Sequence, residues 1–510
     1  MFELPSARSV ERNPGDERLR ELALAHMPRI TVTEFGNINY RAEITARLKN
    51  STFFVSDVEI HQNRISRAEA ERWAARQDAH IAESGMLLVE GYIGPDPDFR
   101  TGSRLFIESS QPNIAAMQTH LYFPPDELWQ PEFTVIYTPT LRAEGKPDDR
   151  LILVDLDNWV TRVFGSDYFG ESKMGGLRMW NRLVYEQGGL ACHAGLKTYP
   201  AESTRSKAEE SMLIIGLSGT GKTTTTFRQQ AGSLPVQDDF VALMPGGLIH
   251  TTEAGCFAKT YGLDPEDEPT IYGGTTRPDA WLESVAVDED GKVDFFDTSY
   301  TANGRCTFPL ANINHRDPSD VPRARYLLIL NRSDHVIPAV ARLDRDQIPA
   351  YFMLGETKGT SAGGAAEAGK SLRVPGTNPF FFDDDSLQGN RLLALLETMP
   401  DLEAYVLNTG RVGGEGHGSK KVHIGDSSAI VQAIVEGTIE WDTDHDFGYE
   451  VARAVPGVDD PELLQPRRLY EGQGRMEEYE STVARLKKER VEYLSSYGML
   501  DPDVLEGLGG

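Results

Sequence analysis

The sequence has only three cysteines, Cys192, Cys256 and Cys306, and none belongs to a C-x-x-C pair. An odd number of isolated cysteines argues against a disulfide framework and against a zinc site of that spacing. No apolar run approaches the roughly 20 residues that a membrane span needs, and residues 1–16 lack the apolar centre of a secretory signal. These absences predict a cytoplasmic chain with no membrane partner.

Positive charge is also scarce, with 51 Lys and Arg against 78 Asp and Glu and a net charge of -27. The excess of acids is spread along the chain. A nucleic-acid-binding protein needs a basic stripe, so no nucleic-acid partner is expected. Two explanations stay open: a carboxylate-rich surface adapted to high salt, or an acidic protein from a GC-rich genome.

The length of 510 residues predicts two or three domains. Ser, Thr, Pro and Lys cluster at residues 196–208, which places the best boundary there. We therefore expect an α/β protein with a mixed N-terminal domain, 1–200, on the substrate side. A C-terminal mononucleotide-binding domain, 201–510, would contain a phosphate loop, a lid loop and a C-terminal helix.

Hydrophobic patterning predicts strands and helices in both parts. Ser66 followed by Glu69 is a capping box, which predicts a helix running to about Gly85. Short apolar runs predict strands and periodic runs predict helices. The expected strands are residues 86–92, 103–108, 133–137, 151–154, 212–215, 325–330 and 404–407, and the expected helices are 392–399, 427–436 and 476–497. Residues 355–370, rich in small side chains, are expected to be a flexible loop.

A glycine-rich pattern, G-x-x-x-x-G-K-[ST], follows the apolar run 212–215 directly. Such glycines let backbone N–H groups surround an anion, and a following helix adds the positive end of its dipole. Lys222 would reach the β- and γ-phosphates, and Thr223 would offer Mg²⁺ a hydroxyl. The loop consists of Gly216, Leu217, Ser218, Gly219, Thr220, Gly221, Lys222 and Thr223. The alternative is a glycine-rich turn without a nucleotide; the preceding strand favours the nucleotide site.

An acidic pair, Asp238 and Asp239, ends a short apolar stretch soon after Lys222. In phosphate-loop enzymes an Asp at a strand end holds the metal directly or through water. Most Asp-Asp pairs are solvated turn residues. The position after this loop favours the metal role.

Six segments occur in the same order as in the ATP-dependent phosphoenolpyruvate carboxykinases. The sequence G-L-S-G-T-G-K-T resembles that family's kinase-1a loop. The others are Y-F-G-E-S-K from Tyr168, E-A-G-C-F-A-K-T from Glu253, E-P-T-I-Y from Glu268, T-A-N-G-R-C-T-F-P around Arg305, and L-N-T-G from Leu407 with S-K-K from Ser419. The resemblance covers residues 165–440 and is weak before 160.

The resemblance implies that oxaloacetate and ATP react to give phosphoenolpyruvate, CO₂ and ADP, a step of gluconeogenesis. Decarboxylation leaves an enolate whose oxygen attacks the γ-phosphate. ATP with Mg²⁺ and a second metal, usually Mn²⁺, are the implied cofactors. Metals and Arg or Lys clamps stabilise the enolate and the transferring phosphoryl group. The family's ATP-using members are often monomers, so a monomer is expected.

The resemblance assigns the nucleotide and metal residues position by position. His193 and Asp239 would bind Mn²⁺, with Asp238 on the Mg²⁺ side and Thr223 on Mg²⁺ itself. Neutral imidazole is a normal ligand for such a metal. Without the resemblance, a lone His is more often a packed or surface residue.

Four basic residues would serve the nucleotide in the same way. Lys222 and Arg305 would neutralise the γ-phosphate, and Lys420 and Lys421 would lie near the nucleotide. By default, Arg305 alone would be read as a surface salt-bridge residue. Its role therefore rests on the matching segment.

Tyr168 would lie at the oxaloacetate end, Lys173 near the substrate and the phosphoryl group, and Arg47 would clamp a substrate carboxylate with two hydrogen bonds. Departures from the family gather at this end. Met174 stands where the family has a neutral Lys ligand, and a thioether is a poor ligand for Mn²⁺. The family's G-R-S-P-K-D is reduced to A-R-L-K-N-S at residues 46–51, and A-G-L-K follows His193.

Three functions stay open. The first is a working carboxykinase with an altered metal preference. The second is a kinase of the same fold for another small molecule or a protein. The third is a non-catalytic ATP-binding protein, which Lys222, Thr223, Asp239 and Arg305 argue against.

Residues 355–370 take the place of the family's mobile lid, which would exclude water; a tolerated surface loop is the alternative.

Overall fold

The structure is a computed structural model and describes residues 2–217, 219–358, 371–414, 416 and 418–508. The chain folds into two units. The first consists of Met1–Glu186, Thr251–Ser319 and Phe380–Asp384, and the second of Gln187–His250, Asp320–Pro379 and Asp385–Gly510. Both units are discontinuous in sequence.

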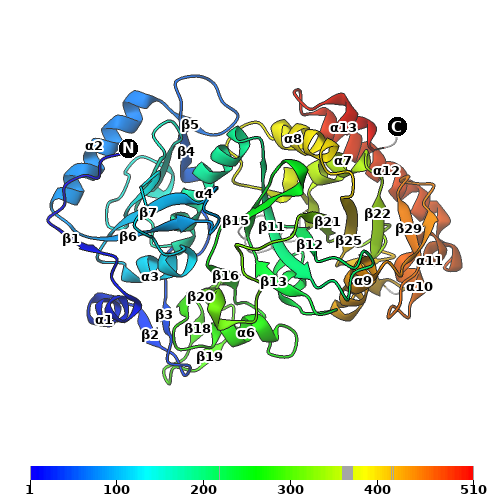
Figure 1. Ribbon diagram of the computed structural model, residues 1–510, viewed down its shortest axis with the longest axis horizontal. Helices are drawn as coiled ribbons and strands as arrows, with labels where there is room; N and C mark the ends of the chain where they lie inside the picture. The colour runs from blue at the N-terminus through cyan, green and yellow to red at the C-terminus, as the bar shows by residue number, and fades with distance from the viewer. Residues whose placement is uncertain (1, 218, 359–370, 415, 417, 509–510) are drawn as a thin grey trace. The chain divides into compact units, whose positions relative to one another are not determined.

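A ten-stranded sheet forms the second unit (Figure 1). Its order is β15(Ile249–Thr251)-β14(Phe240–Leu243)-β11(Leu190–Tyr199)-β12(Glu210–Ile215)-β21(Ala324–Asn331)-β25(Glu403–Asn408)-β22(Val340–Leu343)-β29(Glu450–Ala454)-β28(Glu440–Thr443), with β13(Leu234–Gln237) on β11. The pairs β12–β21 and β21–β25 are parallel. Leu213 and Ile215 enter one apolar core, whereas Met212 and Ile214 enter another. Strand β12 is continuously apolar because both its faces are buried.

Helices and two short hairpins complete the second unit. The helices are α5(Lys222–Phe227), α7(Gln347–Leu354), α8(Ser386–Glu397), α9(Ile424–Glu436), α10(Pro461–Leu464), α11(Pro466–Gly472), α12(Met476–Ser495) and α13(Pro502–Glu506). The hairpins are β23(Glu356–Lys358) with β24(Ser371–Arg373), and β26(Arg411–Val412) with β27(Lys420–Lys421). Helix α5 is short and directly follows the glycine-rich loop.

The first unit contains two larger sheets. The eight-stranded sheet has the order β1(Ser9–Arg12)-β6(Gly85–Ile93)-β7(Thr101–Glu108)-β8(Phe133–Thr138)-β10(Val160–Phe164)-β9(Leu151–Asp155)-β4(Thr52–Val55)-β5(Arg64–Ile65). The five-stranded sheet has the order β16(Gly255–Lys259)-β20(Arg305–Pro309)-β17(Trp281–Glu283)-β3(Ile38–Tyr40)-β2(Ile30–Val32). A small hairpin, β18(Ala286–Val287) with β19(Val293–Asp294), and helices α1(Asp16–His26), α2(Arg67–Ala82), α3(Pro112–Leu121), α4(Phe169–Glu186) and α6(Pro269–Thr275) complete it.

The expected elements occur, with shifted ends. Ser66 caps α2 by accepting a hydrogen bond from the Glu69 backbone N–H, as the capping box predicts. Helix α8 begins six residues before the expected helix 392–399, because the polar residues of its first turns hide its start. Residues 356–358, expected in a loop, pair as strand β23, and 359–370 lie outside the described residues. The mixed α/β class is confirmed.

Candidate active site

The glycine-rich loop joins the buried strand β12 to helix α5, as its pattern predicts. Gly219 and Gly221 have φ of +88° and +91°, in the region that favours glycine. A Cβ on Gly216 would lie 2.4 Å from the Thr220 hydroxyl and 2.9 Å from Leu330 Cβ, so only glycine fits. The position of Ser218 lies outside the described residues.

Neighbouring side chains hold the carbonyls of this loop. Arg332 Nη1 donates to Gly219 O at 2.8 Å, and Thr409 Oγ1 donates to Thr220 O at 2.8 Å. Thr220 Oγ1 donates to Leu217 O at 2.7 Å. The loop backbone is therefore tied to its own chain and to two neighbouring segments.

Lys222, Asp239 and His193 meet at one carboxylate oxygen. Lys222 Nζ lies 3.2 Å and His193 Nε2 2.9 Å from Asp239 Oδ1. The His193 ring stacks on Phe240, with 5.2 Å between centroids. Close by in sequence, Thr223 Oγ1 donates to the buried Asp238 Oδ2 at 2.8 Å. All four residues predicted for the metals thus pair with one another or with Lys222.

The donor set of His193 and Asp239 fits a divalent cation. Burial, and then the charge of Lys222, lower the pKa of His193, which favours the neutral imidazole that binds a metal. Because Nδ1 donates to the Thr377 carbonyl at 2.7 Å, Nε2 presents a lone pair to the carboxylate. Adjacent ligands of an octahedral ion with bonds of about 2.1 Å lie about 3.0 Å apart, close to the observed separation. Within the described ranges, no three His, Cys, Asp or Glu side chains cluster as a metal site.

Arg305 and Tyr168 belong to the first unit, where two further charged residues accompany Arg305. On the neighbouring strands, Lys259 and Glu283 are its cross-strand partners. Burial, and then Arg305, lower the pKa of Lys259 to about 8, and burial raises the pKa of Glu283 to about 8. The buried Tyr168 is close enough to Arg305 for the guanidinium to act on its pKa, which burial raises.

Lys173 and Met174 are buried side by side in α4. Lys173 Nζ lies 2.7 Å from Glu253 Oε1 and 5.1 Å from the Phe257 ring centroid. A small cavity beside this ion pair is lined partly by Gln118, Tyr122 and Thr252. Lys173 is therefore engaged with a carboxylate of its own unit.

The remaining predicted residues differ in their surroundings. Arg47 is half-buried, with its guanidinium 5.7 Å from the centroid of the Phe380 ring. Lys420 contacts Asp460 at 2.7 Å and also Glu462, whereas Lys421 is exposed. The roles of all three stay predictions.

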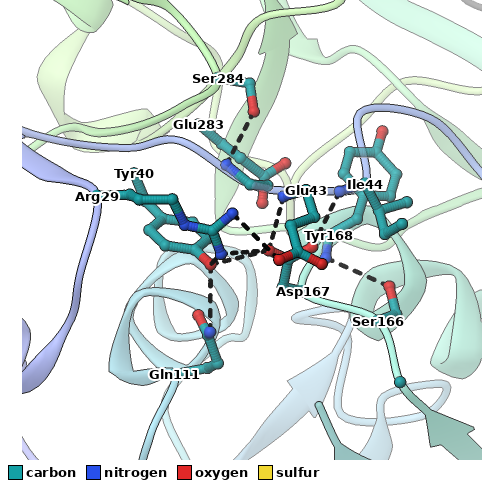
Figure 2. A network of polar contacts seen from close by, with 12 residues as sticks. Arg29, Tyr40, Glu43, Ile44, Gln111, Ser166, Asp167, Tyr168, Glu283 and Ser284 are labelled. Atoms are coloured by element: carbon teal, nitrogen blue, oxygen red, sulfur yellow. Dashed lines mark hydrogen bonds and ion pairs between the residues drawn. The ribbon is translucent and has the colours of Figure 1, made fainter. Parts of the chain in front are cut away.

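Sequence reasoning missed Glu283, Lys259, Asp167 and Glu171 as members of these clusters. Figure 2 shows Asp167 surrounded by the hydroxyl of Tyr40 and by backbone N–H groups. One signal in the sequence was available for Glu283: it is an acidic residue that directly follows two apolar residues in the buried strand β17. Asp167 and Glu171 flank Tyr168 in a segment that the motif covered only in part.

A lysine and two aspartates behind a glycine-rich loop, next to an imidazole, are typical of phosphoryl-transfer enzymes that use a metal. Among the helices that the structure describes, none is both long and apolar enough to cross a membrane.

Comparison with known proteins gives the family. Residues 8–461 match the family described as Phosphoenolpyruvate carboxykinase, and the chain belongs to this family. It is 32% identical over 433 residues to phosphoenolpyruvate carboxykinase (ATP) of Aeropyrum pernix, covering 82% of each chain. It is 31% identical over 422 residues to that of Mesorhizobium japonicum, covering 80% of this chain and 76% of the relative. The resemblance and the expected carboxykinase class are confirmed.

Proposed function

We propose that this chain is an ATP-dependent phosphoenolpyruvate carboxykinase, which converts oxaloacetate and ATP to phosphoenolpyruvate, CO₂ and ADP. The C3–C4 bond of oxaloacetate breaks and its electron pair forms the enolate of pyruvate. The enolate oxygen then bonds to the γ-phosphorus as the bond to the β-phosphate oxygen breaks. The observation that carries the proposal is the Lys222–Asp239–His193 cluster behind the glycine-rich loop, in a chain of this family.

The residues of the second unit serve the nucleotide in this proposal. Residues 216–223 cradle the phosphates, and Lys222 leaves Asp239 to neutralise the γ-phosphate. Thr223 and Asp238, 2.8 Å apart, would hold Mg²⁺, and His193 with Asp239 would hold the second divalent ion. Bound divalent cations supply positive charge to the phosphates and to the enolate oxygen. Lys420 and Lys421 contribute to the nucleotide side.

The first unit serves the substrate. Arg47 clamps a carboxylate, Tyr168 packs at the oxaloacetate end, and Arg305 neutralises the γ-phosphate. Met174 cannot supply the third ligand of Lys type, so Lys173 would take over, water would fill the position, or the site would hold its metal weakly. We further propose a cytoplasmic monomer that acts on small molecules, with domains 1–200 and 201–510 and residues 355–370 as the lid.

A second candidate is a kinase of the same fold with a different acceptor. It is favoured by the engagement of Lys173 with Glu253 at 2.7 Å and by the buried Met174. Both residues belong to the predicted substrate end of the site, and the residues proposed for the nucleotide are the same in both candidate functions.

The test is phosphoenolpyruvate formation from oxaloacetate, ATP, Mg²⁺ and Mn²⁺ by the purified protein, at low and high salt. Lys222→Ala is expected to lower kcat by about 10³-fold, because a preorganised charge at the transferring group is lost. Lys488→Ala, which removes a 75% exposed lysine, is the matched control and should keep full activity. ATP binding without phosphoenolpyruvate formation would overturn the proposal and direct the search to other acceptors.

A further inference from the structure

The segment that carries Arg47, residues 43–48, is here called the Arg47 strap. It contains no strand or helix, so no ladder of hydrogen bonds holds its backbone. At its start, Asp167 accepts hydrogen bonds from the N–H groups of Glu43 at 2.7 Å and Ile44 at 3.0 Å (Figure 2). The Tyr40 hydroxyl donates to the same carboxylate at 2.8 Å.

A second carboxylate holds the other end of the Arg47 strap. Glu171 Oε1 accepts from the Leu48 N–H at 2.7 Å. Glu171 is fully buried, and its other oxygen lies 3.3 Å from the guanidinium of Arg178. A buried carboxylate is costly unless it is paired and hydrogen-bonded, and this one is satisfied on both sides.

The strap is also held through its carbonyls. The Tyr300 hydroxyl donates to Ala42 O, next to the strap, and the Asn303 amide donates to Thr45 O within it. Both side chains lie in the segment that precedes Arg305. Backbone donors and acceptors of the strap are thus engaged by side chains from two distant parts of the first unit.

Asp167 and Glu171 lie on either side of Tyr168, at the start of α4. The groups that face Asp167 are all donors: two backbone N–H groups, the Tyr40 hydroxyl and, at 3.4 Å, the Arg29 guanidinium. A carboxylate accepts from all of them, whereas an amide of the same shape would turn an N–H₂ group toward a donor.

We propose that Asp167 and Glu171 are positioning residues that hold the Arg47 strap beside Tyr168, and so set Arg47 for the substrate carboxylate. The part that concerns the substrate rests on the proposed function; the part that concerns the strap does not. The two buried carboxylates fix the backbone of this segment through the N–H groups of Glu43, Ile44 and Leu48.

The experiment compares the full-length wild type with Asp167→Asn and Glu171→Gln, which keep side-chain shape. Hydrogen exchange of peptides that cover residues 40–50 should be about tenfold faster in either variant, since a charge-assisted hydrogen bond is lost. The KM for oxaloacetate should rise about tenfold, with the KM for ATP within about twofold of wild type.

Asp126→Asn is the matched control. Asp126 also accepts from a tyrosine hydroxyl, Tyr92 at 2.7 Å, and from a backbone N–H, Leu128 at 3.0 Å, and it pairs with Arg100. Its partners lie away from the strap in sequence, so neither exchange over residues 40–50 nor the KM for oxaloacetate should change.

A double-mutant cycle separates positioning from general stability. In an Arg47→Ala background, Asp167→Asn should raise the KM for oxaloacetate less than about twofold, because its effect passes through Arg47. Additive effects, or unchanged exchange in both single variants, would overturn the proposal. If Asp167→Asn does not fold, Glu171→Gln decides it. If the wild type makes no phosphoenolpyruvate, the proposed function is wrong. Hydrogen exchange over residues 40–50 still decides whether Asp167 and Glu171 hold the strap.

Discussion

The glycine-rich loop of the second unit and the Arg47 strap of the first unit hold their backbones by different means. The loop is one continuous motif between a buried strand and a helix, and glycines at φ of +88° and +91° give it its shape. The strap depends on side chains more than 100 residues away in sequence, Asp167, Glu171 and Asn303. Anion binding by backbone can therefore be encoded locally, whereas positioning one arginine here takes distant buried acids.

The largest expected effect concerns the loop side of this comparison. Asp239→Asn removes the carboxylate shared by Lys222 and His193. Because a metal ligand and a charge partner are lost together, activation by Mn²⁺ should need at least about 100-fold more metal. Mn²⁺ titration by electron paramagnetic resonance and by activity measures this. Asp126→Asn should titrate as wild type, and an unchanged Mn²⁺ affinity in Asp239→Asn would remove Asp239 from the metal site.

On the strap side, a variant that keeps the positive charge of Arg47 but loses the two parallel N–H donors of its guanidinium should already bind oxaloacetate less well. Arg47→Lys keeps the charge but cannot bind a carboxylate with two parallel hydrogen bonds, so the KM for oxaloacetate should rise about 10- to 100-fold. Steady-state kinetics with each substrate varied in turn measure it, with Arg453→Lys, at an exposed arginine paired with Glu440, as control. A rise confined to the KM for ATP would place Arg47 at the nucleotide instead.

A smaller effect is expected at the end of helix α5. The buried Lys197 donates to Thr225 O at 3.0 Å, Arg228 O at 2.7 Å and Gln230 Oε1 at 3.1 Å. Lys197→Met leaves these three acceptors without a donor. This should lower the free energy of unfolding by about 1–3 kcal/mol and raise the KM for ATP. Denaturant titration and kinetics measure the two effects. Lys146→Met, which breaks the ion pair with Glu69, should affect stability alone; an unchanged KM for ATP in Lys197→Met would show that α5 does not need this lysine.

The last expected effect is a pH slope from Glu283. Burial raises its pKa in the folded protein from 4.5 to about 8, so between these values the folded state binds the proton that the unfolded state releases. Its contribution to stability is therefore complete below about pH 4.5 and is lost as pH rises toward 8. Glu283→Gln should flatten this part of the wild-type slope in denaturant titrations at pH 5, 6.5 and 8. Parallel slopes for wild type and variant would contradict the raised pKa.

The sequence allowed the second unit to be predicted best where structure is local. The apolar run 212–215, the loop and the short α5 follow one another as the motif predicts. The pairing of His193 with Asp239 came from the resemblance alone, since the two lie on β11 and after β13 and meet only because those strands pair.

Much of the first unit could not be predicted, because its clusters depend on which strands become neighbours. Lys259, Glu283 and Arg305 come together through the order β16-β20-β17, which hydrophobic periodicity does not reveal. The return of residues 251–319 to the first unit is hidden for the same reason, since no composition change marks it. Lys420 is a motif position whose ammonium contacts Asp460 and Glu462, two acids that the motif did not indicate.

The pairing of β3 with β17 also means that β3 is synthesised long before its partner strand. Ile38 lies opposite Trp281 in this parallel pair, so β3 meets its partner only after about 240 more residues are made. At about 5–20 residues per second, this strand waits for about 12 to 50 s. During that interval its apolar edge is without β17, and chaperone binding to the nascent chain should be strongest over the segment around residues 30–40.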